Sequence, residues 1–537
     1  MDRVTSAGAG TPQPGRELAA LMGAAAARQR LGRFDEAARL FERAIELEPG
    51  EPAPWAALAA CRLAARQPRA ALEALAAGLR RIGPNPALFC AEARVLQSLG
   101  RVGEAAARLR QALALDATCG EARLGLALAA LEAGDWDEAQ RLAPPLAAGR
   151  TPPGPWAWVR ARIALARGDF EAARRFAAAA AQAPQLGPEQ RSETLLLLGE
   201  ALDGLGRRSE AFAAFSQGKA ALRRLYAARA QASESETARL ARIAAWLRDA
   251  DPGQWRAAAP DEDDGVRGHA FLFGFPRSGT TLLEQALAGH PHVVSLEEAP
   301  TLAQAQAKFL ATDEGLERLA RLTPAQAAAW RRRYWNEVAR HGVDPAGRVF
   351  LDKAPASTLW LPLVARLFPR AKVLFALRDP RDVVLSCFRS SFQINAMTYA
   401  FTDLAETAAC YGACMALART CRAVLPLDLR EARHEALVEN FDVELGGIAA
   451  FLGLAPNPAM ADVAATARRR VVRTPSAAQV RAGLNHNGLG RWRAYARELA
   501  PVMEALAPWI AAFGYDAGGY EAGGYKAGGY EARGGDG

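Results

Sequence analysis

The stretch Gly274-Phe275-Pro276-Arg277-Ser278-Gly279-Thr280-Thr281 decides how the second half of the chain folds. An apolar run of strand type, residues 269–274, precedes it, and a helix is predicted over residues 282–288 directly after it. A strand, a tight glycine-containing loop and a helix N-terminus bring backbone N–H groups together, and the helix dipole adds partial positive charge. The stretch therefore predicts a loop that binds an anion, with an ordinary strand-to-helix turn as the alternative.

The same stretch also indicates which anion the loop binds. Gly274 and Gly279 have the spacing of a P-loop, but Thr280 stands where a nucleoside triphosphatase carries lysine. Triphosphate hydrolysis uses that lysine and Mg²⁺ to neutralise the β and γ phosphates. Here the positive charge lies inside the loop as Arg277, whose planar guanidinium can hold two oxygens of a phosphosulfate at once.

A second basic segment follows later in the chain. Residues 371–377 form a continuous apolar run typical of a buried parallel strand, and Arg378-Asp379-Pro380-Arg381-Asp382 comes directly after it. Ligands of open α/β sheets collect at the carboxyl ends of strands, so Arg378 and Ser386 are expected to bind a second phosphate. A surface ion pair between Arg378 and Asp379 is the alternative. We therefore predict an α/β, P-loop-like domain with a parallel sheet.

The first half of the chain repeats with a period of 34 residues, marked by Gly32, Arg66, Gly100, Gly134 and Gly168, and continued by Gly206 after a four-residue insertion. Five residues after each marker stands a small residue, where two helices must approach closely: Ala37, Ala71, Ala105, Ala139, Ala173 and Ala211. Larger residues usually follow four positions later, as in Phe41, Leu75, Leu109 and Phe215. One such unit cannot bury its apolar face alone, so we predict an all-α superhelix with a concave groove. The groove is expected to bind a partner or substrate, and a spacer or dimerisation role is the alternative.

Composition sets the broad class of protein. With 537 residues, 50% of them hydrophobic, the chain is expected to form at least two domains. Charged residues and glycine interrupt the apolar stretches, and no secretory signal is found at the N-terminus, so we predict no membrane span and a cytoplasmic location. The seven cysteines lack paired spacing and are expected to be free thiols. The net charge of +8 is compatible with nucleic acid or with small anions, and the prediction is that nucleic acid is not a partner. Oligomeric state is left open.

Pattern changes along the chain define the predicted domain limits. The repeat domain is placed at residues 17–250, a linker at 251–267 and the α/β domain at 268–516. Residues 517–537 are Gly- and Tyr-rich and are expected to be disordered.

The two basic segments together resemble a known family. Residues 275–282 and 377–382 are similar to the 5′-phosphosulfate and 3′-phosphate binding segments of sulfotransferases that use 3′-phosphoadenosine 5′-phosphosulfate (PAPS). Residues 285–291 and 296–298 resemble the tyrosylprotein sulfotransferase branch, and residues 31–38 resemble the second half of a tetratricopeptide repeat. The resemblance implies transfer of a sulfuryl group from PAPS to an acceptor hydroxyl, with protein tyrosine as one candidate and with protein, glycan and small-molecule acceptors left open. The repeat groove would recruit the acceptor.

The resemblance also assigns roles to individual residues. It implies that the 5′-phosphosulfate is held by Arg277, Ser278, Gly279, Thr280 and Thr281, and the 3′-phosphate by Arg378 and Ser386. Glu298 falls on the catalytic base and Lys353 on the lysine that contacts the bridging oxygen. Ser476 and Arg491 match residues that close over the donor, and Arg277 and Ser476 are counted with the catalytic set. No metal is required.

Several alternatives stay open at this level. Glu297 competes with Glu298 as the base, and only one of them is expected to face the cleft because successive residues usually point in different directions. His290 and His292 are alternative bases, although His290 before Pro291 is more typical of a turn. Two departures from the family are Pro300, where a substrate-contacting Arg is usual, and His434, where Tyr is usual. The rival functions are a repeat scaffold with a catalytically silent nucleotide-binding domain and a P-loop kinase.

Overall fold

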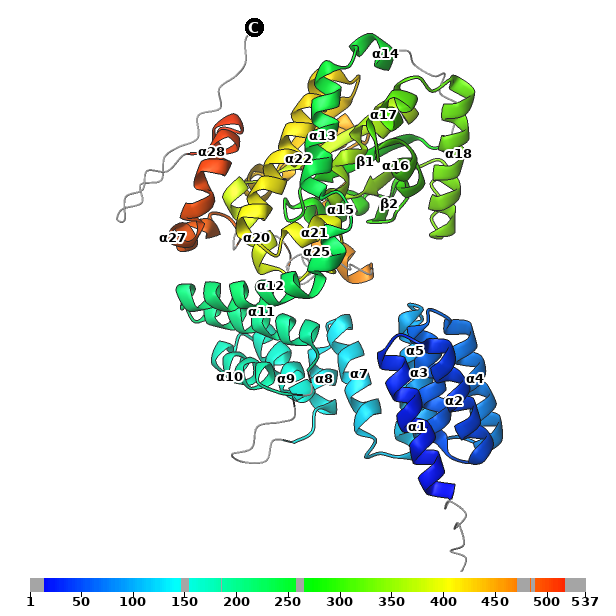
Figure 1. Cartoon of the computed structure of the whole chain (residues 1–537). Coiled ribbons are helices and arrows are strands. Elements are labelled where there is room, and N and C mark those ends of the chain that lie inside the picture. Colours follow the sequence, from blue (N-terminus) through cyan, green and yellow to red (C-terminus); the bar gives the residue numbers. More distant parts are fainter. Residues whose placement is uncertain are drawn as a thin grey trace, which may run out of the picture. The chain divides into compact units, whose positions relative to one another are not determined.

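The computed structural model describes residues 14–145, 154–184, 186–256, 265–470, 483 and 488–516 of the chain. The chain divides into two compact units, Met1–Leu205 and Gly206–Gly537. Figure 1 shows helices alone in the first unit and a sheet covered by helices in the second. None of the described helices combines the length and the apolar character that crossing a bilayer requires.

The first unit is an array of helix pairs. Its helices are α1 (Pro14–Arg30), α2 (Phe34–Leu47), α3 (Pro52–Ala64), α4 (Pro68–Ile82), α5 (Pro86–Ser98), α6 (Val102–Leu115), α7 (Gly120–Ala133), α8 (Trp136–Leu142), α9 (Gly154–Ala166), α10 (Phe170–Ala181) and α11 (Pro188–Gly204). Each odd-numbered helix from α1 to α9 packs on the even-numbered helix that follows it, and neighbouring pairs also contact one another. The predicted all-α repeat architecture is therefore confirmed.

The period of 34 residues has a backbone cause. All six marker residues lie in the left-handed region, with φ between 60° at Arg66 and 77° at Gly134. Glycine adopts this conformation without steric cost, whereas Arg66 adopts it against the preference of a residue with a Cβ. The small residues after the markers, such as Ala37 and Ala139, are completely buried between helices. The marker ends one helix and the alanine lets the next pack closely.

The second unit is built on a parallel sheet of five strands. The strands are β1 (Gly268–Gly274), β2 (Val293–Glu297), β3 (Val349–Lys353), β4 (Lys372–Leu377) and β5 (Asp428–Arg433), in the spatial order β2-β3-β1-β4-β5. Every neighbouring pair is parallel. The carboxyl ends of all five strands therefore lie at one edge, with β1 at the centre.

Helices cover both faces of this sheet. They are α12 (Arg208–Gln231), α13 (Glu236–Asp249), α14 (Pro252–Arg256), α15 (Thr280–Ala288), α16 (Ala303–Phe309), α17 (Asp313–Ala320), α18 (Pro324–Arg340), α19 (Leu361–Leu367), α20 (Pro380–Arg389), α21 (Ala396–Ala400), α22 (Leu404–Val424), α23 (His434–Glu439), α24 (Phe441–Phe451), α25 (Val463–Arg469), α27 (Ala496–Leu499) and α28 (Met503–Ala512), with short 3₁₀ turns η1 (Pro355–Trp360), η2 (Pro458–Ala461), η3 (Arg491–Tyr495) and η4 (Ala500–Val502). Phe271 and Phe273 of β1 enter one core with α13 and α22, and Ala270 and Leu272 enter a second core with α15 and α24. Both faces are buried, as the continuous apolar strands predicted.

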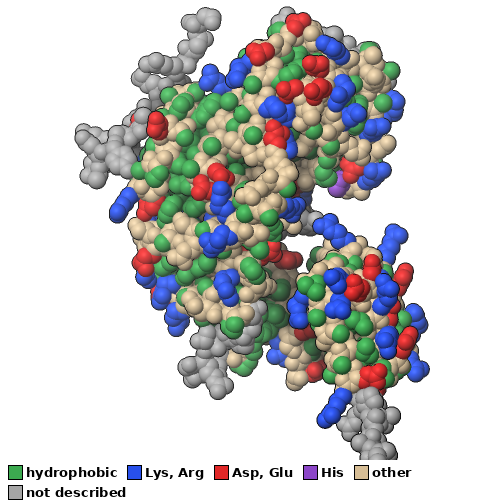
Figure 2. Space-filling model, viewed as in Figure 1, with side chains coloured by type: hydrophobic (Ala, Val, Ile, Leu, Met, Phe, Trp, Pro, Cys, Tyr) green, Lys and Arg blue, Asp and Glu red, His purple; other side chains and the backbone are tan. Residues whose placement is uncertain are grey.

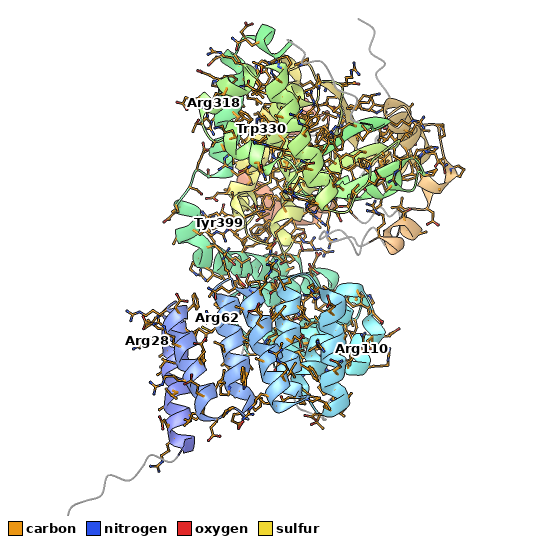
Figure 3. All side chains as sticks on the ribbon, turned by 90° about the vertical axis from the view of Figure 1, so that its right-hand side faces the viewer. Arg28, Arg62, Arg110, Arg318, Trp330 and Tyr399 are labelled. Carbon is orange, nitrogen blue, oxygen red and sulfur yellow. The ribbon has the colours of Figure 1, made fainter. Side chains whose placement is uncertain are left out.

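The structure ends the first unit earlier than the predicted limit at residue 250. Lys219 of α12 is buried and donates a hydrogen bond from Nζ to the backbone oxygen of Ser390 at 2.7 Å. Arg223 forms a bidentate ion pair with Glu406, and its guanidinium group lies over the ring of Tyr399, which is labelled in Figure 3. Because α12 and α13 pack in this way on the sheet domain, they belong to the second unit, although α12 continues the repeat pattern of the first.

The predicted linker also differs from the structure at its start. Residues 252–256 form the short helix α14, and Trp255 is 2% exposed within the core of the second unit. Its ring meets Trp246 of α13 edge to face, with centroids 6.3 Å apart. Residues 257–264 and the tail 517–537 lie outside the described residues.

Candidate active site

The loop between β1 and α15 is shaped by two glycines. Gly274 has φ of 154°, and a Cβ there would lie 2.7 Å from the backbone oxygen of Ala376 in β4. Gly279 has φ of 90°, and a Cβ there would lie 2.4 Å from Nδ1 of His434. Both positions exclude a side chain by conformation and by space, so the loop backbone can pack closely against β4 and His434. The N-terminus of α15 follows this loop directly, which is the arrangement that the predicted anion site requires.

Arg277 lies in this loop in a strained conformation. Its φ is 72°, and only three residues other than glycine have positive φ in the described part of the chain: Arg66, Arg277 and Glu298. The Arg277 Nε donates a hydrogen bond to Ser386 Oγ of α20 at 3.0 Å. Strain of this kind persists where the surrounding structure fixes a residue, and it is concentrated at functional sites. Ser278, Thr280 and Thr281 are buried beside it.

Arg378 follows β4 and reaches the same loop. Its Nη1 donates to the backbone oxygen of Arg277 at 3.1 Å, and its Nη2 donates to the backbone oxygen of Gly488. Its Nε is buried with no hydrogen-bond partner among the described residues. The structure therefore brings Arg277, Ser386 and Arg378 together, because β1 and β4 are neighbours and both end at this edge of the sheet.

His434 completes this side of the site from the end of β5. Burial, together with the charges of Arg378 and Arg277, lowers its pKa to about 3, so the ring is neutral at physiological pH. Its Nδ1 is buried and has no hydrogen-bond partner among the described residues. The neutral ring packs against Gly279, where the resembling family usually carries Tyr.

A C-terminal segment is anchored beside Arg378. Asp382, in the first turn of α20, accepts backbone hydrogen bonds from Gly490 at 2.7 Å and from Trp492 at 2.8 Å. The guanidinium of Arg381 lies 3.7 Å from the centroid of the Trp492 ring. Arg491 is thus held by its backbone next to the Arg378 segment. Ser476 lies outside the described residues.

Lys353 lies at the end of β3 among three carboxylates. Its Nζ is 2.7 Å from Glu298 Oε1, 3.0 Å from Glu297 Oε1 and 3.9 Å from Glu284 Oε2. Burial alone would lower the pKa of Lys353, but the three carboxylates, led by Glu284, raise it above its ordinary value. The ammonium group is therefore charged although it is completely buried.

Glu297 and Glu298 both contact Lys353, although successive residues of a strand usually point in different directions. Both side chains reach Lys353, because the φ of 50° at Glu298 breaks the alternation of the strand. The Glu298 backbone N–H donates to the Lys353 oxygen at 2.7 Å, which fixes this kink. Glu284 was missed by sequence reasoning, since a lone glutamate inside an apolar helix pattern carries no motif.

A buried network of hydrogen bonds supports the loop after Glu298. Asp352 Oδ2 accepts hydrogen bonds from Thr301 Oγ1 at 2.8 Å and from Tyr334 OH at 2.9 Å, and His269 Nε2 lies 2.9 Å from the Tyr334 OH. Burial raises the pKa of Asp352 to about 7, and the two hydrogen bonds oppose that rise. This network connects Thr301 to Asp352 of β3, the strand that ends at Lys353.

The histidines considered as alternative bases have structural contacts. The backbone N–H of His292 donates to His290 Nδ1 at 3.1 Å, and His290 Nε2 donates to the backbone oxygen of Ala455 at 3.1 Å. Both ring nitrogens of His290 are therefore used to hold the turn after α15. No group of three or more metal-ligating side chains is found in the part of the chain that the structure describes.

Two surface hollows of the second unit lie away from these residues. One of about 340 Å³ is lined by α24 and the residues around η2, and one of about 350 Å³ is lined by Lys308, Arg321 and Trp330, near Arg318. Arg318 and Trp330 are labelled in Figure 3. On the face shown in Figure 2, Lys and Arg side chains of this unit lie among Asp and Glu side chains. The residues of the candidate site do not line either hollow, so we define the site by its side-chain contacts.

Comparison with known families agrees with this geometry. Residues 270–458 match the model of the sulfotransferase family, and residues 29–92 and 96–148 match that of the tetratricopeptide repeat. The chain thus combines tetratricopeptide repeats with a sulfotransferase-family domain.

Individual relatives are similar over parts of their length. Protein-tyrosine sulfotransferase of Drosophila melanogaster is 35% identical over 122 residues, which are 22% of this chain and 24% of that protein. Protein-tyrosine sulfotransferase 2 of Gallus gallus is 26% identical over 266 residues, 46% of this chain and 69% of that protein. An uncharacterized protein of Aquifex aeolicus is 26% identical over 45% of this chain, and the match spans 33% of that protein. The sulfotransferase domain of the Synechococcus PCC 7002 olefin synthase is 24% identical with a TM-score of 0.34, over 48% of this chain and 98% of that domain.

Proposed function

We propose that this protein transfers a sulfuryl group from PAPS to an acceptor hydroxyl. The observation that carries the proposal is the contact between the two basic loops, in which Arg378 bonds to the backbone of Arg277 and Arg277 bonds to Ser386. One adenosine bisphosphate skeleton has two anionic ends, and two adjacent basic loops suit it.

The residues present fit such a donor. Gly274 and Gly279 let β4 and His434 pack directly against the loop, and Arg378 Nε and His434 Nδ1 are buried polar atoms with no partner among the described residues. Ser278, Thr280 and Thr281 would hold the 5′-phosphosulfate with Arg277, and Ser386 would hold the 3′-phosphate with Arg378. When bound, PAPS supplies an activated sulfuryl group. Arg491 and Ser476 stay predicted contacts of the donor.

Glu298 is proposed to take the proton of the acceptor hydroxyl. As the acceptor oxygen bonds to sulfur, the bond between sulfur and the phosphate oxygen breaks, and the hydroxyl proton passes to the carboxylate. General base catalysis of this kind contributes roughly 10²–10⁴-fold to rates. The Glu298 side chain is 47% exposed, so it can leave its ion pair with Lys353 and meet an acceptor.

Lys353 and Arg277 are proposed to neutralise charge on the leaving phosphate. The compact ammonium group of Lys353 suits a single bridging oxygen, whereas the guanidinium of Arg277 can hold two oxygens. Both groups are fixed by neighbouring elements before any ligand arrives, which is the condition for electrostatic preorganisation. Most of the rate enhancement is therefore expected from positioning and charge, as in phosphoryl transfer.

Protein tyrosine is the proposed acceptor class, supported by the names of the Drosophila and Gallus relatives. Pro300, where that branch usually has Arg, is a difference in the loop that would face the acceptor. The tetratricopeptide repeats are proposed to recruit the acceptor protein, since stacked repeats form extended binding surfaces.

The test has two parts on the full chain. Addition of 3′-phosphoadenosine 5′-phosphate is expected to raise the melting temperature by several degrees, while ATP with Mg²⁺ leaves it nearly unchanged. Radiolabelled sulfate from PAPS is then followed into a panel of tyrosine peptides, glycans and phenols. Stabilisation by ATP alone would favour a kinase, and stabilisation by the bisphosphate without transfer to any acceptor would favour a binding scaffold.

A further inference from the structure

Glu284 is an ionisable residue in an unusual place: burial raises the pKa of its carboxyl group, and the charges of Lys353 and Arg470 oppose that rise. It lies on α15 one turn after Thr280, and its side chain is completely buried. A buried carboxylate is costly unless it is paired and hydrogen-bonded. Neither the predicted site nor the mechanism above gives it a role.

Its two oxygens have different surroundings. Oε1 accepts a hydrogen bond from Ser295 Oγ at 2.7 Å and lies 3.5 Å from Arg470 Nη1. Arg470 is itself fixed, because its Nη2 donates to Ser295 Oγ at 2.7 Å and to the Ser295 backbone oxygen at 3.2 Å. Oε2 lies 3.9 Å from Lys353 Nζ and has no hydrogen-bond partner among the described residues. Glu284 is thus held in place with one oxygen directed at the Lys353 ammonium group.

The three carboxylates around Lys353 differ in exposure. The side chains of Glu298 and Glu297 are 47% and 15% exposed, whereas that of Glu284 is 0% exposed. When Glu298 turns to an acceptor, Lys353 loses its nearest negative charge, and its buried ammonium group cannot replace that charge with bulk water. Glu284 cannot leave in the same way, because Ser295 and Arg470 hold its other oxygen.

We propose that Glu284 is a positioning residue that keeps Lys353 protonated and in place while Glu298 exchanges between Lys353 and the acceptor. This inference rests on the proposed function. It also connects the anion loop to the lysine, because Thr280 and Glu284 are on the same helix. The charged groups that face Lys353 are Glu284 from α15 and Glu297 and Glu298 from the end of β2, and Arg470 contacts the same cluster from the end of α25.

Removal of this one charge has a predictable sign. Burial lowers the pKa of Lys353, and the charge of Glu284 is the largest single cause that raises it, followed by the charges of Glu298 and Glu297 and the hydrogen bond to Glu298. Glu284→Gln keeps the size of the side chain and an acceptor for Ser295, but it removes the negative charge. The pKa of Lys353 is therefore expected to fall, since burial is then less compensated.

The protonation of Lys353 can be measured without turnover. The chain has only five lysines, Lys219, Lys308, Lys353, Lys372 and Lys526, so lysine labelled with ¹³C at Cε gives few resonances. The Lys353 signal is assigned by its loss in Lys353→Arg. We expect this signal to titrate at lower pH in Glu284→Gln than in the native protein.

Kinetics provide the second readout. In Glu284→Gln we expect kcat to fall about 10–100-fold, the KM for PAPS to change less than about threefold, and the alkaline limb of the pH–rate profile to move to lower pH. Glu236→Gln is the matched control, since Glu236 is also a buried carboxylate but pairs with Arg239 of α13, outside this cluster. In Glu236→Gln, the titration of Lys353 and the pH–rate profile are expected to equal those of the native protein.

The outcomes separate this inference from the proposed function. If the Lys353 signal titrates in Glu284→Gln as it does in the native protein, Glu284 does not keep Lys353 protonated and the inference is wrong. If Glu284→Gln does not fold, the second variant is Ser295→Ala, which removes the hydrogen bond that fixes Glu284. It is expected to lower the pKa of Lys353 by a smaller amount, and the inference is wrong if the pKa of Lys353 does not change. Absence of transfer by the native protein contradicts the proposed function, whereas the lysine titration still decides the role of Glu284.

Discussion

Nη1 of Arg378 lies 3.1 Å from the backbone oxygen of Arg277, so the loops after β1 and β4 share a hydrogen bond at the centre of the sheet edge. The contact occurs between residues that are far apart in the sequence, and it fixes the backbone of the anion loop from the side of the second loop. A change at Arg378 therefore affects both anionic ends of a donor.

Arg378→Lys is expected to weaken binding of 3′-phosphoadenosine 5′-phosphate about 10–100-fold. Lysine keeps the charge but cannot bond at the same time to Arg277, Gly488 and a phosphate, because it lacks the planar fork. Isothermal titration calorimetry measures the loss. Arg422→Lys, at an exposed ion pair of α22, is the control and is expected to bind like the native protein. Equal affinity of both variants would show that Arg378 does not contact the donor.

Glu298→Gln is expected to lower kcat about 10²–10⁴-fold while leaving affinity for the bisphosphate within about threefold. Glu297→Gln is expected to lower kcat less than about tenfold, because its side chain is less exposed and stays on Lys353. Single-turnover transfer of labelled sulfate separates the two. A larger loss in Glu297→Gln would exchange the two roles.

Asp352 predicts a pH dependence of stability. Its folded pKa of about 7 is above the ordinary value of 3.8, so the folded protein binds this proton more readily than the unfolded chain does. The stabilisation is complete below about pH 4 and is lost as the pH rises through about 7. Asp352→Asn does not titrate, so it is expected to melt close to the native protein at pH 5 and several degrees above it at pH 8.5. Asp428→Asn, at an exposed position of β5, leaves the pH dependence unchanged, and a native-like slope in Asp352→Asn would refute the assignment.

Arg66→Gly is expected to stabilise the first unit by about 0.5–1 kcal/mol. The left-handed φ of 60° is strained for arginine, and the gain is reduced by the greater freedom of glycine in the unfolded chain. Chemical denaturation of the full chain, followed by hydrogen exchange of α3 and α4, measures the change. Ala65→Gly, at the neighbouring residue with negative φ, is expected to destabilise instead.

The regular parts of the fold could be predicted from the sequence. The markers and the alanines after them gave the helix pairs, because a left-handed turn and a close helix contact each require particular residues. The strand runs before Gly274 and Arg378 gave the parallel sheet and its ligand edge. The end of the first unit at Leu205, rather than at residue 250, could not be predicted, since α12 keeps the repeat pattern while Lys219 and Arg223 pack on the sheet domain.

The residues of the candidate site that belong to sequence motifs could be predicted, whereas those that meet only through tertiary contacts could not. Arg277 and Arg378 stand in two recognisable loops, and Ser386 lies in the helix that follows the second loop. The reach of both Glu297 and Glu298 to Lys353 depends on one backbone angle, and the role of Glu284 depends on strand order, which brings β2 and β3 together. Sequence spacing records neither property.

Asp382 lies in the first turn of α20, which begins just after Arg378, and it accepts hydrogen bonds from the backbone amides of Gly490 and Trp492. Nη2 of Arg378 lies 3.9 Å from Asp382 and also bonds to the backbone oxygen of Gly488. Because Arg378 and Asp382 hold the backbone at Gly488, Gly490 and Trp492, removal of the chain from Gly488 onward would take away the carbonyl that Arg378 Nη2 bonds to and leave its guanidinium less fixed beside the anion loop.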